Sequence, residues 1–548
     1  MAEQRPTVKL PQGIVQGVTL KNNHLPRPVE AFRGVPYALP PTGDRRFRQA
    51  QPVVPHPDLV IDASAYGPAA PGKPLLAGGP KLEYSEDCLH ANIFRHVPAS
   101  EEAETKKERK LLPVAVYIHG GAFNRGTSSG HNTASMVAFS EEPFIAVSFN
   151  YRLGALGFLP STASEKEGIL NLGLRDQLVL LEWVRDNIHH FGGDKDSVTL
   201  FGLSAGGHSI GHLIMHYKEG EKPLFHRAII ESGAATSRAV RPYNAPIHEE
   251  QFQEFLRQAK MPTDTPAEGI FPYLRSLSTD AISAAQTATF DKYNPSLRWA
   301  FQPVIDGDII PRPPLETWKS GRWHKVPIMT GFTRNEGSLY VKKRLDNPAL
   351  FPKFFAELLP LLSEEDIATI DRLYADPSQH PDSPYKETRD KVGSQYRRIE
   401  QAYAHYAYVA PVRQTAELAS PSTPVYVYQW ALEATVLEGA RHGDNMRYEF
   451  CGPLVVAISE GQRRLARTMH GYVTSFIIAG DPNAVPTSGL ERPAWPRYEV
   501  GRAKAMVFGE KDKSLVGGAP GPAAEVQDDS WERDKCEFWW SKVELSQQ

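Results

Sequence analysis

Short apolar runs alternate with amphipathic segments through the middle of the chain. Continuous apolar runs occupy 112–118, 144–149, 197–203 and 326–329, and each is followed by a glycine or polar cluster. Runs of this length without polar alternation are typical of strands buried on both faces of a sheet. A further run, VYVYQWAL at 425–432, predicts another strand of this kind.

Two longer segments have the spacing of helices with one apolar face. Apolar residues recur at steps of three and four within 172–191 and again within 465–479, and each segment ends at a glycine, Gly192 or Gly480. Helices that alternate with buried strands predict an α/β fold with a large, mostly parallel central sheet and helices on both faces. The segment from about 240 to 400 is richer in helical patterns and prolines, which predicts helical insertions around the sheet.

The chain shows no internal repeat and no compositional boundary. A charge-dense stretch at 100–111 lies between apolar runs and is interpreted as a surface loop. Pro/Gly-rich stretches at 67–80 and 516–523 do not separate blocks of different composition. We therefore expect residues 1–548 to form a single domain, with helical insertions at about 240–400.

The amino-acid composition excludes several classes of protein. The 548 residues include 61 Lys plus Arg and 64 Asp plus Glu, and 41% of them are hydrophobic. A net charge of −3 gives no electrostatic reason to bind nucleic acid, and three cysteines exclude a disulfide scaffold. No apolar leader is visible in the first residues, and no apolar run is long enough to span a membrane. These absences predict a cytoplasmic protein, while the oligomeric state stays unknown.

Residues 202–206, Gly-Leu-Ser-Ala-Gly, form a G-x-S-x-G motif between a predicted strand and a plausible helix. A sharp strand-to-helix turn would project the Ser204 hydroxyl above the strand ends, where it could act as a nucleophile. Gly202 and Gly206 would be needed because such a turn leaves no room for side chains. The alternative is a glycine-rich turn with a bystander serine.

Backbone amides near this serine could stabilise an oxyanion. His119, Gly120 and Gly121 end the strand at 112–118, and a loop with two glycines can direct N–H groups at one point. The amides of Gly120 and Gly121 are therefore candidate donors, together with that of Ala205 directly after the serine. The alternative is an ordinary turn at the end of a strand.

A serine hydroxyl needs a histidine base and a carboxylate that holds it, and in α/β-hydrolases the chain order is Ser, acid, His. Glu336 follows the predicted strand near 326–329, and His442 lies in a loop after the strand at 425–432. These residues are candidates for the acid and the base. A solvated turn carboxylate and a surface histidine remain the alternatives on spacing alone.

The chain resembles the type B carboxylesterase/lipase family of cholinesterase-like α/β-hydrolases, and within it an intracellular, fungal-type carboxylesterase. Matching segments are distributed over most of the chain and are FRGVPYALPP at 32–41, SEDCLHANIF at 85–94, VYIHGGAF at 116–123, NYRLGALGFL at 150–159, the segment 171–194, VTLFGLSAGGHS at 198–209, GFTRNEG at 331–337 and GARHGDN at 439–445. The resemblance implies the α/β-hydrolase fold, a small-molecule ester substrate and neither metal nor cofactor. It implies Ser204 as nucleophile, Glu336 as acid and His442 as base, with Gly120, Gly121 and Ala205 as oxyanion donors.

The resemblance also assigns supporting residues. Ser232 resembles a serine that contacts the acid. Two structural ion pairs are implied, Arg46 with Glu86 and Arg152 with Asp176. Three aromatic residues are candidates for the pocket wall, with packing in the core as the preferred interpretation: Phe123, Trp299 and Trp430.

Two positions depart from the family pattern. Leu203 stands where the family has a glutamate before the nucleophile, which removes a buried carboxylate and makes a choline-like cation a poor substrate. Cys88 has no cysteine upstream with which to pair, so we expect a buried thiol.

Three functions are compatible with these residues. The first is hydrolysis of carboxylic esters through an acyl-enzyme. The second uses the same triad for acyl transfer, or for tailoring hydrolysis or cyclisation of a natural product, and product analysis with candidate acceptors would distinguish it. The third is a non-catalytic interaction domain, which the presence of both nucleophile and base disfavours.

Overall fold

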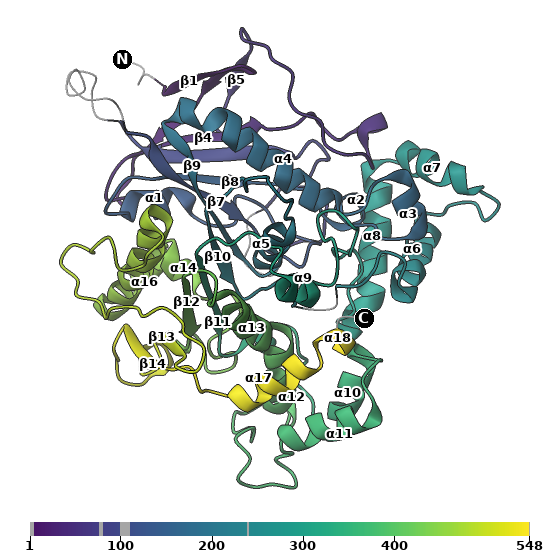
Figure 1. Ribbon diagram of the computed structural model, residues 1–548, viewed down its shortest axis with the longest axis vertical. Helices are drawn as coiled ribbons and strands as arrows, with labels where there is room; N and C mark the ends of the chain where they lie inside the picture. The colour runs from purple at the N-terminus through teal and green to yellow at the C-terminus, as the bar shows by residue number, and fades with distance from the viewer. Residues whose placement is uncertain (1–4, 76–80, 99–109, 238–239, 547–548) are drawn as a thin grey trace.

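A large mixed β-sheet runs through the middle of the molecule (Figure 1). The computed structural model describes residues 5–75, 81–98, 110–237 and 240–546; the charged stretch at 100–111 therefore lies almost wholly outside the described residues. Eleven strands pair in the order β14-β13-β12-β11-β10-β9-β7-β8-β6-β4-β3. In chain order their bounds are Val18–Leu20 (β3), Val29–Pro36 (β4), His90–His96 (β6), Leu112–Ile118 (β7), Ile145–Phe149 (β8), Gly193–Leu203 (β9), Arg227–Glu231 (β10), Ile328–Thr333 (β11), Val425–Trp430 (β12), Lys504–Phe508 (β13) and Ala524–Asp528 (β14).

The centre of this sheet is parallel and its edges are antiparallel. Strands β8, β7, β9, β10, β11, β12 and β13 pair in parallel, while β3, β4, β6 and β14 join antiparallel. The mostly parallel sheet predicted from the apolar runs is confirmed. A separate three-stranded sheet consists of β1 (Thr7–Leu10), β2 (Gly13–Gln16) and β5 (Val60–Asp62).

Each central strand buries both of its faces, as the unbroken apolar runs predict. Along β7, Val114, Val116 and Ile118 enter one hydrophobic cluster, whereas Ala115 and Tyr117 enter another on the opposite face. Helices α4 (Leu172–Asn187) and α5 (Ala205–Met215) cover the first face, and α1 (Thr133–Phe139) and α16 (Glu460–Ala479) cover the second. Because consecutive strand residues point to opposite faces, both positions must be apolar.

The two predicted amphipathic helices are present. α4 ends at Asn187 and is followed by a 3-10 turn, Ile188–Phe191, before Gly192 adopts a φ of 87°. α16 begins five residues before the first apolar residue of its stripe because the Ser459 side chain caps its amino end. Gly480 ends it with a φ of 73°, a left-handed conformation in which glycine is favoured.

Most of the remaining helices lie between β10 and β12, in or beside the segment that the sequence marks as helical. Figure 1 places α6, α7 and α8 together on the right of the molecule, with α10 and α11 below them. The bounds are Gly154–Gly157 (α2), Thr162–Glu167 (α3), Pro246–Gln258 (α6), Ile270–Ser276 (α7), Thr279–Tyr293 (α8), Pro314–Ser320 (α9), Leu350–Leu358 (α10), Glu364–Leu373 (α11), Tyr396–Ala404 (α12), Ala410–Ala419 (α13), Met446–Glu449 (α14), Pro453–Val456 (α15), Arg533–Ser541 (α17) and Val543–Ser546 (α18).

Two buried ion pairs join segments that are distant in the sequence, and both were expected from the family resemblance. Arg46 Nε donates to Glu86 Oε2 at 2.7 Å, and Arg152 Nε donates to Asp176 Oδ2 at 2.8 Å. A second hydrogen bond, from Nη2 to the other carboxylate oxygen, makes each pair bidentate.

We expect Asp176→Ala to reduce the free energy of unfolding by about 3–5 kcal/mol, because it leaves the buried Arg152 guanidinium without its counterion. Urea unfolding followed by fluorescence would measure the change. Asp186→Ala is the matched control, since Asp186 is more than half exposed and, among the described residues, pairs with its neighbour Arg185 alone. A loss below about 1 kcal/mol for Asp176→Ala, typical of a surface pair, would contradict this role.

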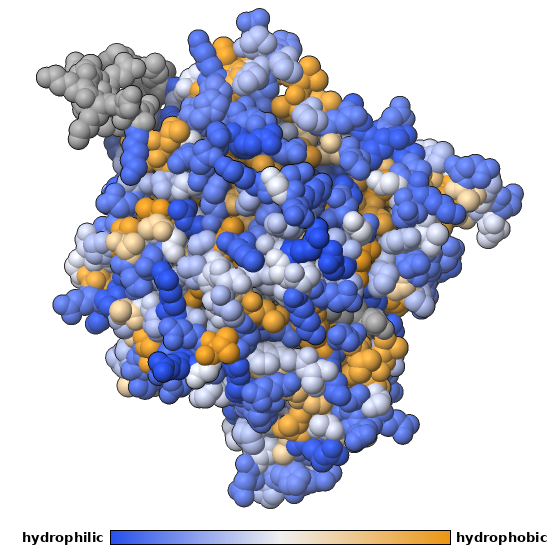
Figure 2. All heavy atoms as spheres, viewed as in Figure 1, coloured by the Kyte–Doolittle hydropathy of each residue, from blue (hydrophilic) through white to orange (hydrophobic). Residues whose placement is uncertain are grey.

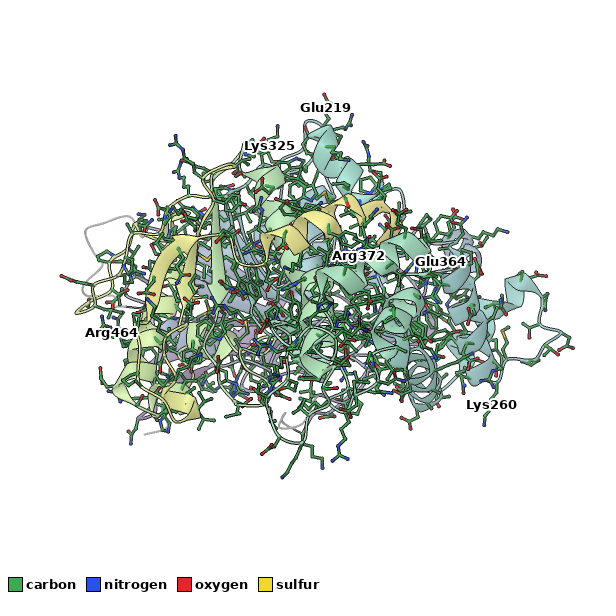
Figure 3. All side chains as sticks on the ribbon, turned by 90° about the horizontal axis from the view of Figure 1, so that it is seen from below. Glu219, Lys260, Lys325, Glu364, Arg372 and Arg464 are labelled. Atoms are coloured by element: carbon green, nitrogen blue, oxygen red, sulfur yellow. The ribbon has the colours of Figure 1, made fainter. Side chains whose placement is uncertain are left out.

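The outer surface is a mixture of polar and apolar residues without a dominant patch on the face seen in Figure 2. Charged side chains such as Glu219, Lys260 and Arg464 lie at the periphery of the view in Figure 3. All three cysteines are buried free thiols, as predicted for Cys88. Among the helices of the described residues, none combines the length and apolarity needed to cross a membrane.

Candidate active site

A sharp turn between β9 and α5 holds Ser204. The strand ends at Leu203 and the helix begins at Ala205, so Ser204 alone forms the turn, with φ 58° and ψ −123°. This conformation is unfavourable for a residue with a side chain, and such strain persists where the surrounding structure enforces it. The Ser204 amide donates to the backbone oxygen of Glu231 on β10 at 2.8 Å, which anchors the turn to the sheet.

Close backbone packing explains the small residues around this serine. A Cβ on Gly206 would lie 2.0 Å from the backbone oxygen of Ile118, and one on Gly202 would lie 2.9 Å from Gly206. A Cβ on Gly207 would lie 2.8 Å from the oxygen of Glu231. The predicted need for glycine on both sides of Ser204 is therefore confirmed by the packing.

The loop after β7 lies against the same turn. A Cβ on Gly120 would lie 2.6 Å from the Leu203 oxygen and 3.0 Å from Ser204 Cβ, so this loop touches the serine directly. His119 fixes the loop: its Nδ1 pairs with the Gly120 oxygen at 2.9 Å and its ring stacks on Tyr151 at 4.5 Å. Burial lowers the pKa of His119 to about 4, so its imidazole is neutral near neutral pH.

Glu336 and His442 meet although 106 residues separate them. Glu336 follows β11 and is fully buried, and one of its carboxylate oxygens accepts a hydrogen bond from His442 Nδ1. The other oxygen accepts from Ser232 Oγ at 2.6 Å and from the Thr333 amide at 2.8 Å. The His442 side chain is only 6% exposed. The alternatives of a solvated carboxylate and a surface histidine are therefore wrong, and Ser232 contacts Glu336, as the resemblance implied.

Two tyrosines that the sequence did not single out pack against the imidazole. The rings of Tyr340 and Tyr408 lie 5.6 and 4.7 Å from that of His442, and the Tyr408 hydroxyl donates to the Tyr340 hydroxyl at 2.8 Å. Tyr408 comes from a π-helical turn at 405–409 between α12 and α13. Such a turn inserts one residue into a helix and often accompanies a functional site, but it leaves no clear mark in the sequence.

One cavity of about 840 Å³ opens onto Ser204 and His442. Its wall includes Gly120, Gly121 and also Ala122, which has a φ of 55° and whose amide is a further candidate anion donor. The apolar part of the wall is formed by Leu75, Phe290, Pro295, Leu297, Trp299, Leu339, Val341, Leu345, Leu350, Phe354 and Ile399. In the described chain, no cluster of His, Cys, Asp or Glu side chains could hold a metal ion.

The three aromatic candidates for the pocket wall have different surroundings. Trp299 lines the cavity, and its ring lies 5.6 Å from that of Tyr340. Phe123 instead belongs to the hydrophobic core, where it packs against Phe158. Trp430 packs against Tyr448 in the other large cluster. Packing, the preferred interpretation, therefore applies to Phe123 and Trp430.

Leu203, the departure from the family pattern, lines the same cavity as His442. A Cβ on Gly443 would lie 2.9 Å from Leu203 Cδ2, and Gly443 has a φ of 79°, a conformation in which glycine is favoured. Behind the turn, however, lie two buried carboxylates that the sequence did not single out, Glu231 and Glu449. Asn445 Nδ2 bridges them, at 3.3 Å from Glu231 Oε1 and 2.6 Å from Glu449 Oε1. The site therefore retains buried acid groups despite Leu203.

Burial raises the pKa of both carboxyls, that of Glu449 to about 7 and that of Glu231 well above its ordinary value. A carboxyl with a raised pKa keeps its proton in the folded state after the unfolded chain has released it. Its contribution to stability therefore falls as the pH rises from about 4.5 toward 7.

We expect the difference in unfolding free energy between the wild type and Glu449→Gln to fall over this range by up to about 1.4 kcal/mol per pH unit. Urea unfolding of both proteins at three pH values would measure it. Taking the difference between the two proteins removes the contributions to stability of the groups that titrate alike in both. A difference that stayed constant or rose with pH would contradict a neutral, buried carboxyl.

Comparison with known proteins decides the family of this site. A model of the carboxylesterase family matches residues 4–539, nearly the whole chain. The chain belongs to the carboxylesterase family. Secreted lipase 4 of Gibberella zeae is 34% identical over 539 residues, which cover 97% of this chain and 91% of the lipase. Lipase 1 of Geotrichum candidum is 30% identical, over 89% of this chain and 90% of the lipase.

Solved structures support the same assignment. The crystal structure of EstA from Aspergillus niger matches with a TM-score of 0.79 at 25% identity and covers 99% of both chains. This carboxylesterase therefore has the α/β-hydrolase fold that the resemblance implied, and it is a carboxylic ester hydrolase.

The expectation of a cytoplasmic protein is wrong. A relative 34% identical over 97% of this chain is a secreted lipase, which contradicts that expectation. The expectation rested on missing signals and on an unpaired Cys88, and neither constrains the compartment physically. The buried thiol is stable without a partner because burial raises its pKa far above neutral and keeps it protonated.

Proposed function

We propose that this carboxylesterase hydrolyses its esters through a Ser204–His442–Glu336 triad and an acyl-enzyme intermediate. The observation that carries the proposal is the hydrogen bond between His442 Nδ1 and the buried Glu336 carboxylate, on the wall of the cavity that also exposes Ser204. A histidine held at Nδ1 presents Nε2 as the proton acceptor.

In this mechanism Ser204 Oγ attacks the ester carbonyl while His442 Nε2 takes the hydroxyl proton. Glu336 keeps the Nδ1–H tautomer and stabilises the imidazolium that forms. Ser232 and the Thr333 amide hold the second carboxylate oxygen, so the carboxylate cannot rotate away from the ring. The rings of Tyr340 and Tyr408 pack against the imidazole and restrict its movement.

The negative charge that develops on the carbonyl oxygen would be stabilised by backbone amides. Gly120, Gly121 and Ala205 supply the donors in the proposal, and Ala122 continues the same loop. Ala205 is also the first residue of α5, so the positive end of this helix adds to the potential. One such donor contributes roughly 3–4 kcal/mol to transition-state stabilisation in other enzymes.

His442 then returns its proton to the leaving alcohol, and the acyl group stays on Ser204. Water enters, His442 takes one of its protons, and the same steps release the acid and restore the serine. The apolar wall formed by residues such as Leu297, Trp299 and Phe354 suits esters with an extended hydrocarbon part.

A fluorophosphonate reagent tests the nucleophile without any substitution. The reagent should inactivate the wild-type protein in proportion to labelling, with one adduct per chain, and peptide mass spectrometry should place the adduct on Ser204. Excess of a slowly hydrolysed ester should protect against labelling. An adduct on another serine that accompanied the loss of activity would overturn the assignment.

A further inference from the structure

Arg125 is a cation on the cavity wall that forms no direct ion pair within the described residues. It follows the loop of candidate oxyanion donors and is half-buried, and its guanidinium lies 5.7 Å from the centre of the Phe290 ring. Its side chain makes no ion pair and no hydrogen bond to any residue that the structure describes. Burial lowers the pKa of Arg125, but a guanidinium remains charged at neutral pH.

Its stem lies directly beside the reaction centre. The Arg125 amide donates to the Gly121 oxygen at 3.0 Å, and a Cβ on Gly121 would lie 2.8 Å from Arg125 Cγ. The ring beneath the guanidinium, Phe290, stacks on Trp299 with centroids 6.0 Å apart. Trp299 in turn contacts Tyr340 beside the base, so the cation and the base belong to one continuous wall.

The other charges nearby do not neutralise it. The cavity wall also contains Lys342, Lys353 and Glu357, and Glu357 pairs with Lys353 at 3.7 Å. Asp291, next to Phe290, attracts the Arg125 guanidinium, but its carboxylate is paired with Lys73 at 2.5 Å. A partly desolvated cation in a largely apolar cavity costs free energy that the aromatic contact only partly offsets. A bound anion would recover that cost.

We propose that Arg125 binds an ionised carboxylate of the substrate, so that this enzyme prefers half-esters of dicarboxylic acids over neutral esters of the same length. The proposal rests on hydrolysis at Ser204. A guanidinium matches a carboxylate through two parallel hydrogen bonds, and one positive charge balances one negative charge. A phosphate dianion would leave a net charge in this apolar wall, which disfavours it.

The test compares two substrates of equal shape. Monoethyl suberate carries the ester and a carboxylate, and the monoethyl ester of suberic acid monoamide replaces the carboxylate by a neutral amide. Ethanol release gives kcat/KM for each, and the adipate and sebacate pairs scan the distance between ester and anion. For the preferred chain length, we expect the wild-type kcat/KM for the carboxylate substrate to be roughly tenfold or more above that for the amide. A ratio of this size corresponds to a charge-assisted hydrogen bond.

Two Arg125 variants and a control distinguish specific binding of the carboxylate by Arg125 from general electrostatic attraction of an anion to the cavity wall. Arg125→Met keeps the stem and removes the charge, and it should reduce the anion-to-amide ratio of kcat/KM by roughly tenfold to a hundredfold. Arg125→Lys should retain part of the preference. Lys342→Met removes an exposed lysine from the same wall, and the ratio should change by less than about threefold because solvent screens that charge.

Calorimetry with suberic acid monoamide, which contains no ester, measures anion binding without turnover. We expect binding to the wild type and at least tenfold weaker binding to Arg125→Met. No preference for the anion at any chain length, or equal binding by both proteins, would overturn the proposal. Failure to hydrolyse a neutral aryl ester would instead refute the function at Ser204, and the calorimetric result would still decide the role of Arg125.

Discussion

Ser204→Ala should lower kcat for an activated aryl ester by roughly 10⁵- to 10⁶-fold, the range seen when a triad nucleophile is removed. The reason is geometric as well as chemical. Ser204 is the only residue of the strand-to-helix turn, so no neighbouring hydroxyl takes its place at the end of β9. Any activity of the variant above the uncatalysed rate in water would come from the backbone donors and from substrate binding alone.

Ser197→Ala is the matched control, because it removes a hydroxyl from the amino-terminal half of the same strand. There the hydroxyl accepts a hydrogen bond from Arg227, and no other partner occurs among the residues that the structure describes. Its activity should match the wild type, and thermal unfolding of both variants would show that the fold is kept. Ser204→Ala activity above about 1% of wild type would remove Ser204 from the mechanism.

Glu336→Gln should reduce kcat by about 10⁴-fold with little change in KM, as replacing the acid of a triad by its amide does elsewhere. An amide at this position can donate to Nδ1, which favours the wrong imidazole tautomer. It also cannot stabilise the imidazolium that forms when Ser204 loses its proton. Steady-state kinetics with the aryl ester would measure both constants.

Glu400→Gln provides a demanding control for this prediction. Glu400 is also a buried glutamate and lies close to the acid in the fold, but its partners are Asn335 and Gln401. Its substitution should change kcat by less than about tenfold, because it does not contact the base. Equal losses for both variants would mean that Glu336 acts by supporting the local structure and not by holding His442.

The sheet and the nucleophile turn could be predicted from the sequence because their causes are local. A run such as 112–118 is apolar at every position because both of its faces are covered, and β7 has the predicted bounds. The glycines around Ser204 are required by contacts within a few residues of the turn and its neighbouring strands. The helix at 465–479 was predicted with a late start, because its capping residue, Ser459, lies outside the apolar stripe.

The sequence by itself determined the fold class and, together with the family resemblance, predicted Ser204, Glu336, His442 and Ser232 as site residues. Only the tertiary structure decided which charges and rings surround them. Tyr408, Glu449 and Arg125 carry no motif, since each contacts a residue far away in the chain, namely His442, Glu231 and Phe290 respectively. Hydrophobic periodicity records which side of an element is buried, but the partner across a cavity depends on how all the elements pack together.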